Sequence, residues 1–442
     1  MHPSPGGSPG HLTHTFKMEN KVPGQSAAQK IIAHASGKDS VAIGEIVFAK
    51  VDAQLMHDNQ GPYRMGKDFE SLGLPIWDKN KFVLTADHHN PPTKDTQTKV
   101  LNITRDFAKE HELPHFYDGE GICHILMAER GFVRPGGILT GTDSHTTNAG
   151  ALGALGIAVG PTESIGILTT GEVWLRVPET IRVDFNGKMP LGTWGKDLSL
   201  LAIKDIGVAG GDYKVLEWGG DAVMSLPVED RMTLTNMSAE VSAKSSLIEV
   251  DEKTEAYLRE AGVEGGWKAF TSDPDVTYAA RYEYDVSDLS PQVACPHRMD
   301  NVFPIEEVDS GPIQRAHIGS CTGAKLEDLR GASRVIKGHK VAHGVQLLIA
   351  PASKAIMNKA WAEGTLEPII DAGGILMPTT CGICTGTGLG QLGPGETCVS
   401  SANRNYKGRM GSIDASIYLG SAAMVAASAI RGHVADPREF LS

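Results

Sequence analysis

The stretch Gly374-Ile-Leu-Met-Pro-Thr-Thr-Cys381-Gly-Ile-Cys384 joins a short apolar run directly to a C-x-x-C pair. A third cysteine, Cys321, lies upstream in Gly-Ser-Cys-Thr-Gly. Three thiolates are an incomplete set for a tetrahedral zinc ion or an ordinary iron–sulfur cluster, because both usually take four protein ligands. A [4Fe–4S] cluster held by only three cysteines would leave one iron open to act as a Lewis acid. The pattern therefore indicates chemistry and not only electron transfer or structural support.

Working outward from this stretch, strand-like and helix-like segments alternate along the chain. The pattern predicts strands over Lys81–Ala86, Gly136–Thr140, Val345–Ala350 and Gly374–Met377, and helices over Ala27–Ser36, Lys94–Glu112 and Ser353–Glu363. This alternation is typical of an α/β fold with a mainly parallel sheet. In such sheets ligands bind beyond the carboxyl ends of the strands, and Cys381 and Cys384 fall on a loop of that kind.

A chain of 442 residues is long for one domain. We predict a disordered, polar, Pro/Gly-rich tail over residues 1–26, in which Met18 is an alternative start. Three α/β domains are expected to follow. The first spans 27–180 and carries acid–histidine motifs, the second spans 181–296, and the third spans 297–442 and carries the cysteines and two arginines.

The composition is that of an ordinary enzyme, and the net charge of −12 argues against broad binding of nucleic acids or anionic membranes. Six cysteines do not suggest a disulfide framework, so a reduced cytoplasm is expected. Cys123, Cys295 and Cys398 are interpreted as small buried hydrophobes. Ala422–Ile430 is too short for a membrane span and predicts a buried helix of small residues.

Histidine–carboxylate pairs are dense in the first third of the chain. Asp87-His88 and Asp143-Ser144-His145 each follow a predicted strand, and His124 lies in Gly-Ile-Cys-His. A serine-protease triad is not credible, because adjacent residues in one loop cannot converge like groups from separate loops. Taken singly, each histidine is more often structural. A carboxylate beside an imidazole nevertheless stabilises the cation, which predicts general acids here.

Two later motifs are weaker taken alone. Asn236 and Glu240 have the i, i+4 spacing that places both on one face of a helix, where a helix cap or a solvated face is the simpler interpretation. Arg404 and Arg409 flank Gly408, and arginine forks suit carboxylate recognition, although such a pair is often a surface feature.

Together these residues resemble the large, catalytic subunits of the aconitase superfamily, of the 3-isopropylmalate dehydratase and homoaconitase type. The resemblance covers about residues 27–436. The matching motifs, in family order, are Asp87-His88, Gly121-Ile-Cys-His124, Gly141-Thr-Asp-Ser-His-Thr-Thr-Asn148, Asn236-Met-Ser-Ala-Glu240, Gly319-Ser-Cys321-Thr, Cys381-x-x-Cys384 and Asn403-Arg-Asn-x-x-Gly-Arg409.

The resemblance implies three α/β/α subdomains packed around one [4Fe–4S] cluster per subunit, held by Cys321, Cys381 and Cys384. Its fourth iron would bind the hydroxyl and a carboxylate of the substrate. The implied catalytic residues are Asp87, His88, His124, Asp143, His145 and Glu240. The implied substrate-binding residues are His57, Ser144, Asn148, Asn236, Arg404 and Arg409. Asn403 would lie beside the cluster.

The resemblance also implies a partner. The base in this superfamily is a serine alkoxide on a mobile swivel domain, and we expect this chain to lack that domain and to need a separate small subunit that carries it. The expected heterodimer would be a cytoplasmic hydro-lyase acting on a small hydroxy-di- or tricarboxylate.

Two departures from the family pattern weaken a direct assignment to leucine biosynthesis. Gly323 takes the place of the usual Asn after Ser-Cys-Thr, and His89 extends the usual Asp-His-Asn. We favour 3-isopropylmalate as substrate, with homoaconitase or a methylmalate-, 2,3-dimethylmalate- or maleate-type hydratase as the alternative. Two other classes stay open: a regulator that binds RNA in the apo form, and a redox protein with Cys398 as a fourth cluster ligand.

Overall fold

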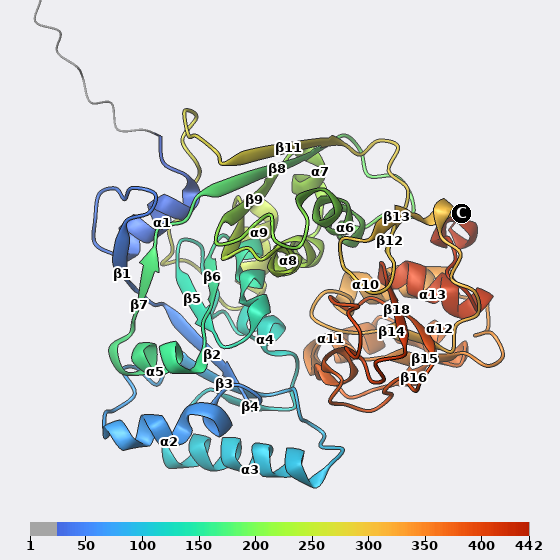
Figure 1. Cartoon of the computed structure of the whole chain (residues 1–442), viewed down its shortest axis with the longest axis horizontal. Coiled ribbons are helices and arrows are strands. Elements are labelled where there is room, and N and C mark those ends of the chain that lie inside the picture. The colour runs from blue at the N-terminus through green and yellow to red at the C-terminus, as the bar shows by residue number, and fades with distance from the viewer. Residues whose placement is uncertain (1–23, 442) are drawn as a thin grey trace, which may run out of the picture.

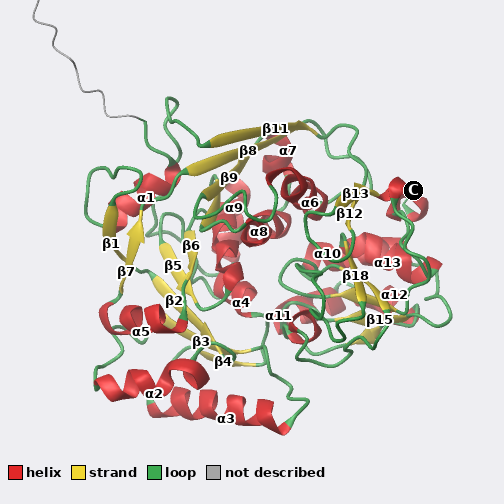
Figure 2. Cartoon of the chain, viewed as in Figure 1, coloured by secondary structure: helices red, strands yellow, loops and turns green. Residues whose placement is uncertain are grey.

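The computed structural model describes residues 24–441 and has the predicted α/β architecture, with four sheets in that part of the chain (Figures 1 and 2). Residues 1–23 of the predicted tail lie outside the described residues. Gly24 to Ser26 belong to the folded part, because Gly24 bridges to Val276 and Ser26 caps helix α1 (Ala27–Ala35).

The first large sheet is parallel throughout, in the order β4-β3-β2-β5-β6. Strand β3 is buried along its whole length because it lies inside the sheet and helices pack against it, which explains its uninterrupted apolar sequence. The strands are β2 (Ala53–His57), β3 (Phe82–Ala86), β4 (Phe116–Asp118), β5 (Ile138–Gly141) and β6 (Leu155–Ala158). The helical segments here are α2 (Pro62–Leu72), α3 (Asp95–Glu110), α4 (Cys123–Glu129), η1 (Ser144–Leu152) and α5 (Pro161–Thr170). Strands β1 (Ile46–Lys50) and β7 (Glu172–Arg176) form a separate antiparallel pair.

The second sheet is also parallel, in the order β10-β9-β8-β11. Its strands are β8 (Thr180–Asn186), β9 (Val215–Gly219), β10 (Ser245–Ile248) and β11 (Ala280–Asp285). Its helical segments are α6 (Gly195–Ile206), α7 (Asp221–Ser225), α8 (Val228–Met237), η2 (Ser238–Val241) and α9 (Glu252–Glu260).

The third sheet has the order β13-β12-β18-β17-β14-β15-β16, and only its β12 pairings are antiparallel. Its strands are β12 (Gln292–Ala294), β13 (Val302–Pro304), β14 (Arg315–Ile318), β15 (Gln346–Ile349), β16 (Ile375–Leu376), β17 (Thr397–Ser400) and β18 (Ser416–Leu419). Its helical segments are η3 (Ile305–Glu307), α10 (Leu326–Ile336), α11 (Lys354–Ala362), α12 (Leu366–Asp371), η4 (Gly382–Thr385), α13 (Ala422–Arg431) and η5 (Pro437–Phe440).

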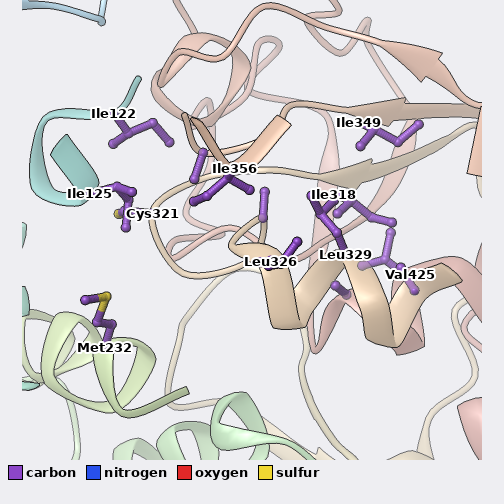
Figure 3. Packing of buried hydrophobic residues seen from close by; sticks show 14 of the residues in the cluster. Ile122, Ile125, Met232, Ile318, Cys321, Leu326, Leu329, Ile349, Ile356 and Val425 are labelled. Atoms are coloured by element: carbon purple, nitrogen blue, oxygen red, sulfur yellow. The ribbon is translucent and has the colours of Figure 1, made fainter. Parts of the chain in front are cut away.

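The largest core runs between these layers and includes Cys321 (Figure 3). Met232 of α8 and Ile125 of α4 share this core with Leu326 of α10, and Cys321 lies among them. Helix α13 is the predicted small-residue helix, and its alanines let α10 approach closely. Within residues 24–441, no helix combines the length and the apolar character that a bilayer crossing requires.

One local prediction is wrong. Asn236 and Glu240 do not share one continuous α-helix, because α8 ends at Met237 and Glu240 lies in the following 3-10 turn, η2. The solvated-face interpretation is wrong as well, because both side chains are buried.

Candidate active site

The predicted site residues meet at the carboxyl ends of strands from two sheets. Loops after β3 and β5 bring the acid–histidine motifs, and loops after β14, β16 and β17 bring the cysteines and arginines. They surround a cavity of ≈ 370 Å³, a size typical of small-molecule sites. The predicted residues that line it are His57, His88, His124, Asp143, Ser144, His145, Cys321, Cys381, Cys384, Asn403, Arg404 and Arg409. The others, Asp87, Asn148, Asn236 and Glu240, are buried behind this lining.

Asp143 is the centre of the histidine cluster. Its Oδ1 lies 2.9 Å from His124 Nε2 and accepts the backbone N–H of His145 at 2.8 Å. Its Oδ2 lies 3.5 Å from His88 Nε2 and 3.8 Å from His57 Nε2. One carboxylate therefore faces imidazoles from several separate loops, an arrangement that sequence spacing alone does not reveal.

His88 lies between two carboxylates, since its Nδ1 is 3.1 Å from Asp87 Oδ1 while its Nε2 faces Asp143. Burial disfavours the imidazolium, but the charge of Asp87 and hydrogen bonds with both carboxylates outweigh it and hold the pKa of His88 well above its usual range. Burial likewise opposes the ionised form of Asp143, and the charge of His124 outweighs it, so the pKa of Asp143 lies well below its usual range. A cationic His88 at the cavity wall can act as a general acid.

Glu240 joins the other acid–histidine pair to an arginine. Its Oε1 lies 2.7 Å from His145 Nε2, and Arg404 Nε donates to both carboxylate oxygens at 3.0 and 2.8 Å. Arg404 Nη2 also donates to Ser144 Oγ at 3.0 Å. Burial raises the pKa of Glu240, but the Arg404 charge and His145 outweigh it and keep that pKa low. Arg404 is thus already paired with an anion, unlike the free carboxylate binder that its sequence motif suggests.

The three cysteines share a network with Asn403 and Arg409. Asn403 Nδ2 donates to Asn236 Oδ1 at 2.6 Å and lies 3.6 Å from Cys321 Sγ, and Asn403 Oδ1 lies 3.9 Å from Cys384 Sγ. Arg409 Nη2 lies 3.8 Å from Cys384 Sγ. The hydrogen bond from Cys381, together with the charge of Arg409, holds the pKa of Cys384 well below its usual range. Amide and guanidinium donors around adjacent thiols are the surroundings that a cysteine-ligated iron–sulfur cluster needs.

Hard cations have geometrically possible sites here as well. Two groups, His57–Asp58–Asp87–His88 and His124–Asp143–His145, each bring potential ligand atoms within 4.8 Å of one another. Asp87 with His88, and Asp143 with His124, are already paired with each other as described above. The thiols are the softer donors and suit iron–sulfur ligation better.

Sequence reasoning missed two residues at this site. Asp58 is fully buried and accepts the backbone N–H groups of His88 at 3.1 Å and His89 at 2.8 Å, so it fixes the loop that carries His88. The His-Asp dipeptide at the end of a strand was the available signal for Asp58.

Cys123 is the second residue that was missed. It lines the cavity, whereas Cys398 is buried in β17 and does not. The position of Cys398 in β17 gives no support to the alternative of Cys398 as a fourth cluster ligand and agrees with its interpretation as a small buried hydrophobe.

Gly323 is a glycine because Ser401 occupies the space beside it. A Cβ at position 323 would lie 2.2 Å from Ser401 Oγ and 2.4 Å from Ser401 O. We expect Gly323→Ala to lower the free energy of unfolding by about 1–3 kcal/mol in urea denaturation of the apo-protein. Gly166→Ala is the matched control, because, its own helix backbone apart, no atom of residues 24–441 comes within 4 Å of its Cβ position and the residue is in helix α5. Equal stability of the two variants would contradict this explanation of Gly323.

The burial of His57 should make the stability of the fold sensitive to acid. His57 is 1% exposed, both ring nitrogens lack hydrogen-bond partners among the described residues, and burial together with the charge of His88 lowers its pKa to about 3. An unfolded histidine has a pKa of about 6.5, so the unfolded state binds the extra proton between these values, and stability falls as the pH falls. We expect His57→Phe to reduce the slope of unfolding free energy between about pH 4 and 6, by at most about 1.4 kcal/mol per pH unit. His343→Phe, at an exposed position, is the control, and an unchanged slope in His57→Phe would exclude this role.

Three cysteines that face histidine–carboxylate pairs across one cavity are the donor set expected in a hydro-lyase of the iron–sulfur class. The chain belongs to the aconitase family: the model of the aconitase family (aconitate hydratase) matches residues 29–432. Proteins of this family are hydro-lyases that bind a [4Fe–4S] cluster.

Similar proteins match over nearly their whole length. The chain is 42% identical to the "probable 3-isopropylmalate dehydratase large subunit" of Methanothermobacter thermautotrophicus, over 93% of this chain and 98% of the relative. It is also 42% identical to "3-isopropylmalate dehydratase large subunit 1" of Methanopyrus kandleri, over 95% and 100%. The "probable methanogen homoaconitase large subunit" of M. thermautotrophicus is 39% identical over 93% and 97%.

Proposed function

We propose that this chain is the large subunit of a hydro-lyase that dehydrates and rehydrates a hydroxy-dicarboxylate, with 3-isopropylmalate as the first candidate and homocitrate-type tricarboxylates as the second. The observation that carries the proposal is the single cavity with Cys321, Cys381 and Cys384 on its wall together with His88 and Asp143. The names of the relatives support the choice of substrate.

The cysteines fit the cofactor, and we propose that they hold one [4Fe–4S] cluster per chain. When bound, such a cluster would supply a Lewis acid for the substrate hydroxyl. His88, held as a cation by Asp87 and Asp143, would donate the proton that the departing hydroxyl needs.

The remaining polar groups would bind and orient the substrate. Arg409 faces the cavity, and its Nε lacks a hydrogen-bond partner among residues 24–441, so we assign it to a substrate carboxylate. Arg404 would hold Glu240 and His145 in place while its remaining N–H groups reach the substrate. Ser144 lies at the cavity wall beside it, whereas Asn148 and Asn236 would position Asn403 from behind.

We propose that a separate small subunit completes the site and supplies the base at carbon. The support is that the relatives are named large subunits and are covered over 97–100% of their length.

We also propose three structural units near 27–180, 181–296 and 297–442, because each larger sheet draws its strands almost entirely from one range. Strand β12 is the exception, since it joins the third sheet.

The test is EPR spectroscopy with iron analysis of anaerobically purified protein, before and after mild oxidation, followed by addition of 3-isopropylmalate, homocitrate or 2-methylmalate. We expect loss of one iron to give a [3Fe–4S] signal that ferrous iron reverses, and we expect the true substrate to perturb the reduced spectrum. Turnover is then measured with and without the candidate small subunit. A cluster that keeps every iron and ignores every diacid, or full turnover by the isolated chain, would contradict the proposal.

A further inference from the structure

Lys196 of helix α6 is a buried lysine that is not ion-paired with any carboxylate of the described residues. The residue is 2% exposed, and within residues 24–441 the partners of its Nζ are a hydroxyl and two carbonyl oxygens. The ammonium instead donates to Thr322 Oγ1 at 3.2 Å, Ser401 O at 3.0 Å and Ala402 O at 2.7 Å. Three donors meet three acceptors, which matches a charged ammonium better than a neutral amine.

A second buried lysine shows how a buried ammonium is usually neutralised, namely by a neighbouring carboxylate. Lys325 is 1% exposed, and its Nζ lies 2.8 Å from Asp328 Oδ2 and 3.0 Å from Thr233 Oγ1. A buried charge without such an opposite charge is destabilising. Burial and the charge of Lys325 lower the pKa of Lys196 to about 8, which leaves it mostly protonated at neutral pH, while the charge of Asp328 and then Cys321 and Cys384 act in the opposite direction.

The three acceptors of Lys196 belong to two loops of the site. Thr322 directly follows Cys321, whereas Ser401 and Ala402 directly precede Asn403 and Arg404. Helix α6 belongs to the second sheet's layer, and both loops belong to the third. A single side chain from one layer therefore bonds to both the segment that carries Cys321 and the segment that carries the Asn403–Arg404 pair. The two segments also bond directly to each other, since Thr322 Oγ1 donates to Ser401 O at 3.1 Å and Ser401 Oγ donates to Gly323 O at 3.0 Å.

We propose that Lys196 is a positioning residue of this site, which joins the Cys321 loop to the Asn403–Arg404 loop and supplies the positive charge that balances the cysteine-bound centre. The charge part of this inference rests on the proposed cluster, whereas the loop-joining part does not. Loss of the cation would destabilise the more negative, reduced form of the cluster, because net charge nearby sets iron–sulfur potentials.

The test compares Lys196→Met with the double variant Lys325→Met/Asp328→Asn. The double variant removes a buried ion pair of similar exposure without changing the net charge. Two quantities are measured: the reduction potential of the cluster by EPR-monitored titration, and hydrogen exchange of the amides of residues 320–323 and 401–404 in the metal-free protein. If Lys196→Met does not fold, Lys196→Gln takes its place, because it keeps a donor while losing the charge.

For Lys196→Met we expect the equilibrium constant for reduction of the cluster to fall at least tenfold, so that the reduction potential becomes at least 59 mV more negative for a one-electron couple. We also expect faster amide exchange in both loops. The double variant keeps the net charge, so it should match the wild type in potential and in the exchange of residues 401–404. Residues 320–323 are not compared in it, because Lys325 Nζ contacts Thr233, which donates to Thr322 O at 3.2 Å. A potential equal to that of the wild type in a variant with full iron content would overturn the proposal, as would unchanged exchange in the apo-protein. If the wild type itself binds no four-iron cluster, the proposed function fails, and the exchange experiment still decides the loop-joining role.

Discussion

Replacing Cys384 by serine is expected to abolish both cluster retention and turnover. Cys384 is the thiol whose pKa is lowered by Cys381 and Arg409, so it is the cysteine most ready to ligate iron as a thiolate. A serine hydroxyl has no comparable affinity for iron–sulfur clusters. We expect iron and acid-labile sulfide per chain to fall to background, and the kcat measured with the partner subunit to fall below detection.

The matched controls for Cys384→Ser are serine replacements at two other buried cysteines. Cys398→Ser should keep the full iron content and turnover, because Cys398 lies in β17 away from the cavity. Cys123→Ser is the sharper control, because Cys123 lines the cavity together with the three predicted ligands and so is a candidate for a fourth ligand. We expect its cluster to be retained and still to lose one iron on oxidation. Loss of the whole cluster in Cys123→Ser would favour a redox protein with four thiolate ligands.

The sequence was sufficient to predict the fold class because its strands are continuous apolar runs ending in polar loops. The run Phe82–Ala86 is buried throughout, and the acid–histidine motif follows it directly, as expected for parallel sheets. The predicted element bounds agree with the structure to within a few residues at Asp95–Glu110 and Lys354–Ala362. The antiparallel position of β12 in the third sheet was not predictable, because its partner β18 is distant in the sequence.

The sequence was enough to predict which residues form the site, but not which of their side chains contact one another. Spacing indicated Asp143 and His145, yet it gave no sign that the carboxylate of Asp143 would also face His88 and His57. Lys196 carried no signal at all, since a lysine in an amphipathic helix is normally solvated. Its burial arises from tertiary packing between α6 and two loops of the third sheet, which local sequence does not encode.

Replacing Asp143 by asparagine is expected to lower kcat by about 10²–10⁴-fold, the usual contribution of a positioned proton-transfer group. Asparagine keeps the size and a carbonyl acceptor for the N–H of His145, so the loop after β5 should keep its shape. It removes the negative charge that faces His88 and His124. The cluster cysteines are untouched, so iron content should remain at the wild-type level and serves as the internal control.

The pH profile separates a catalytic role of Asp143 from a merely structural one. His88 acts as an acid only while protonated, so the activity it supports is lost as the pH rises through its pKa. Asp87 is the largest of the influences that raise this pKa, and the hydrogen bond with Asp143 adds to it. Without Asp143 the pKa of His88 falls, and the alkaline limb of kcat must therefore move to lower pH. A variant with a reduced kcat but an unmoved alkaline limb would show that the proton comes from a group other than His88. His124, whose carboxylate partner among residues 24–441 is Asp143, would then be the residue to replace next.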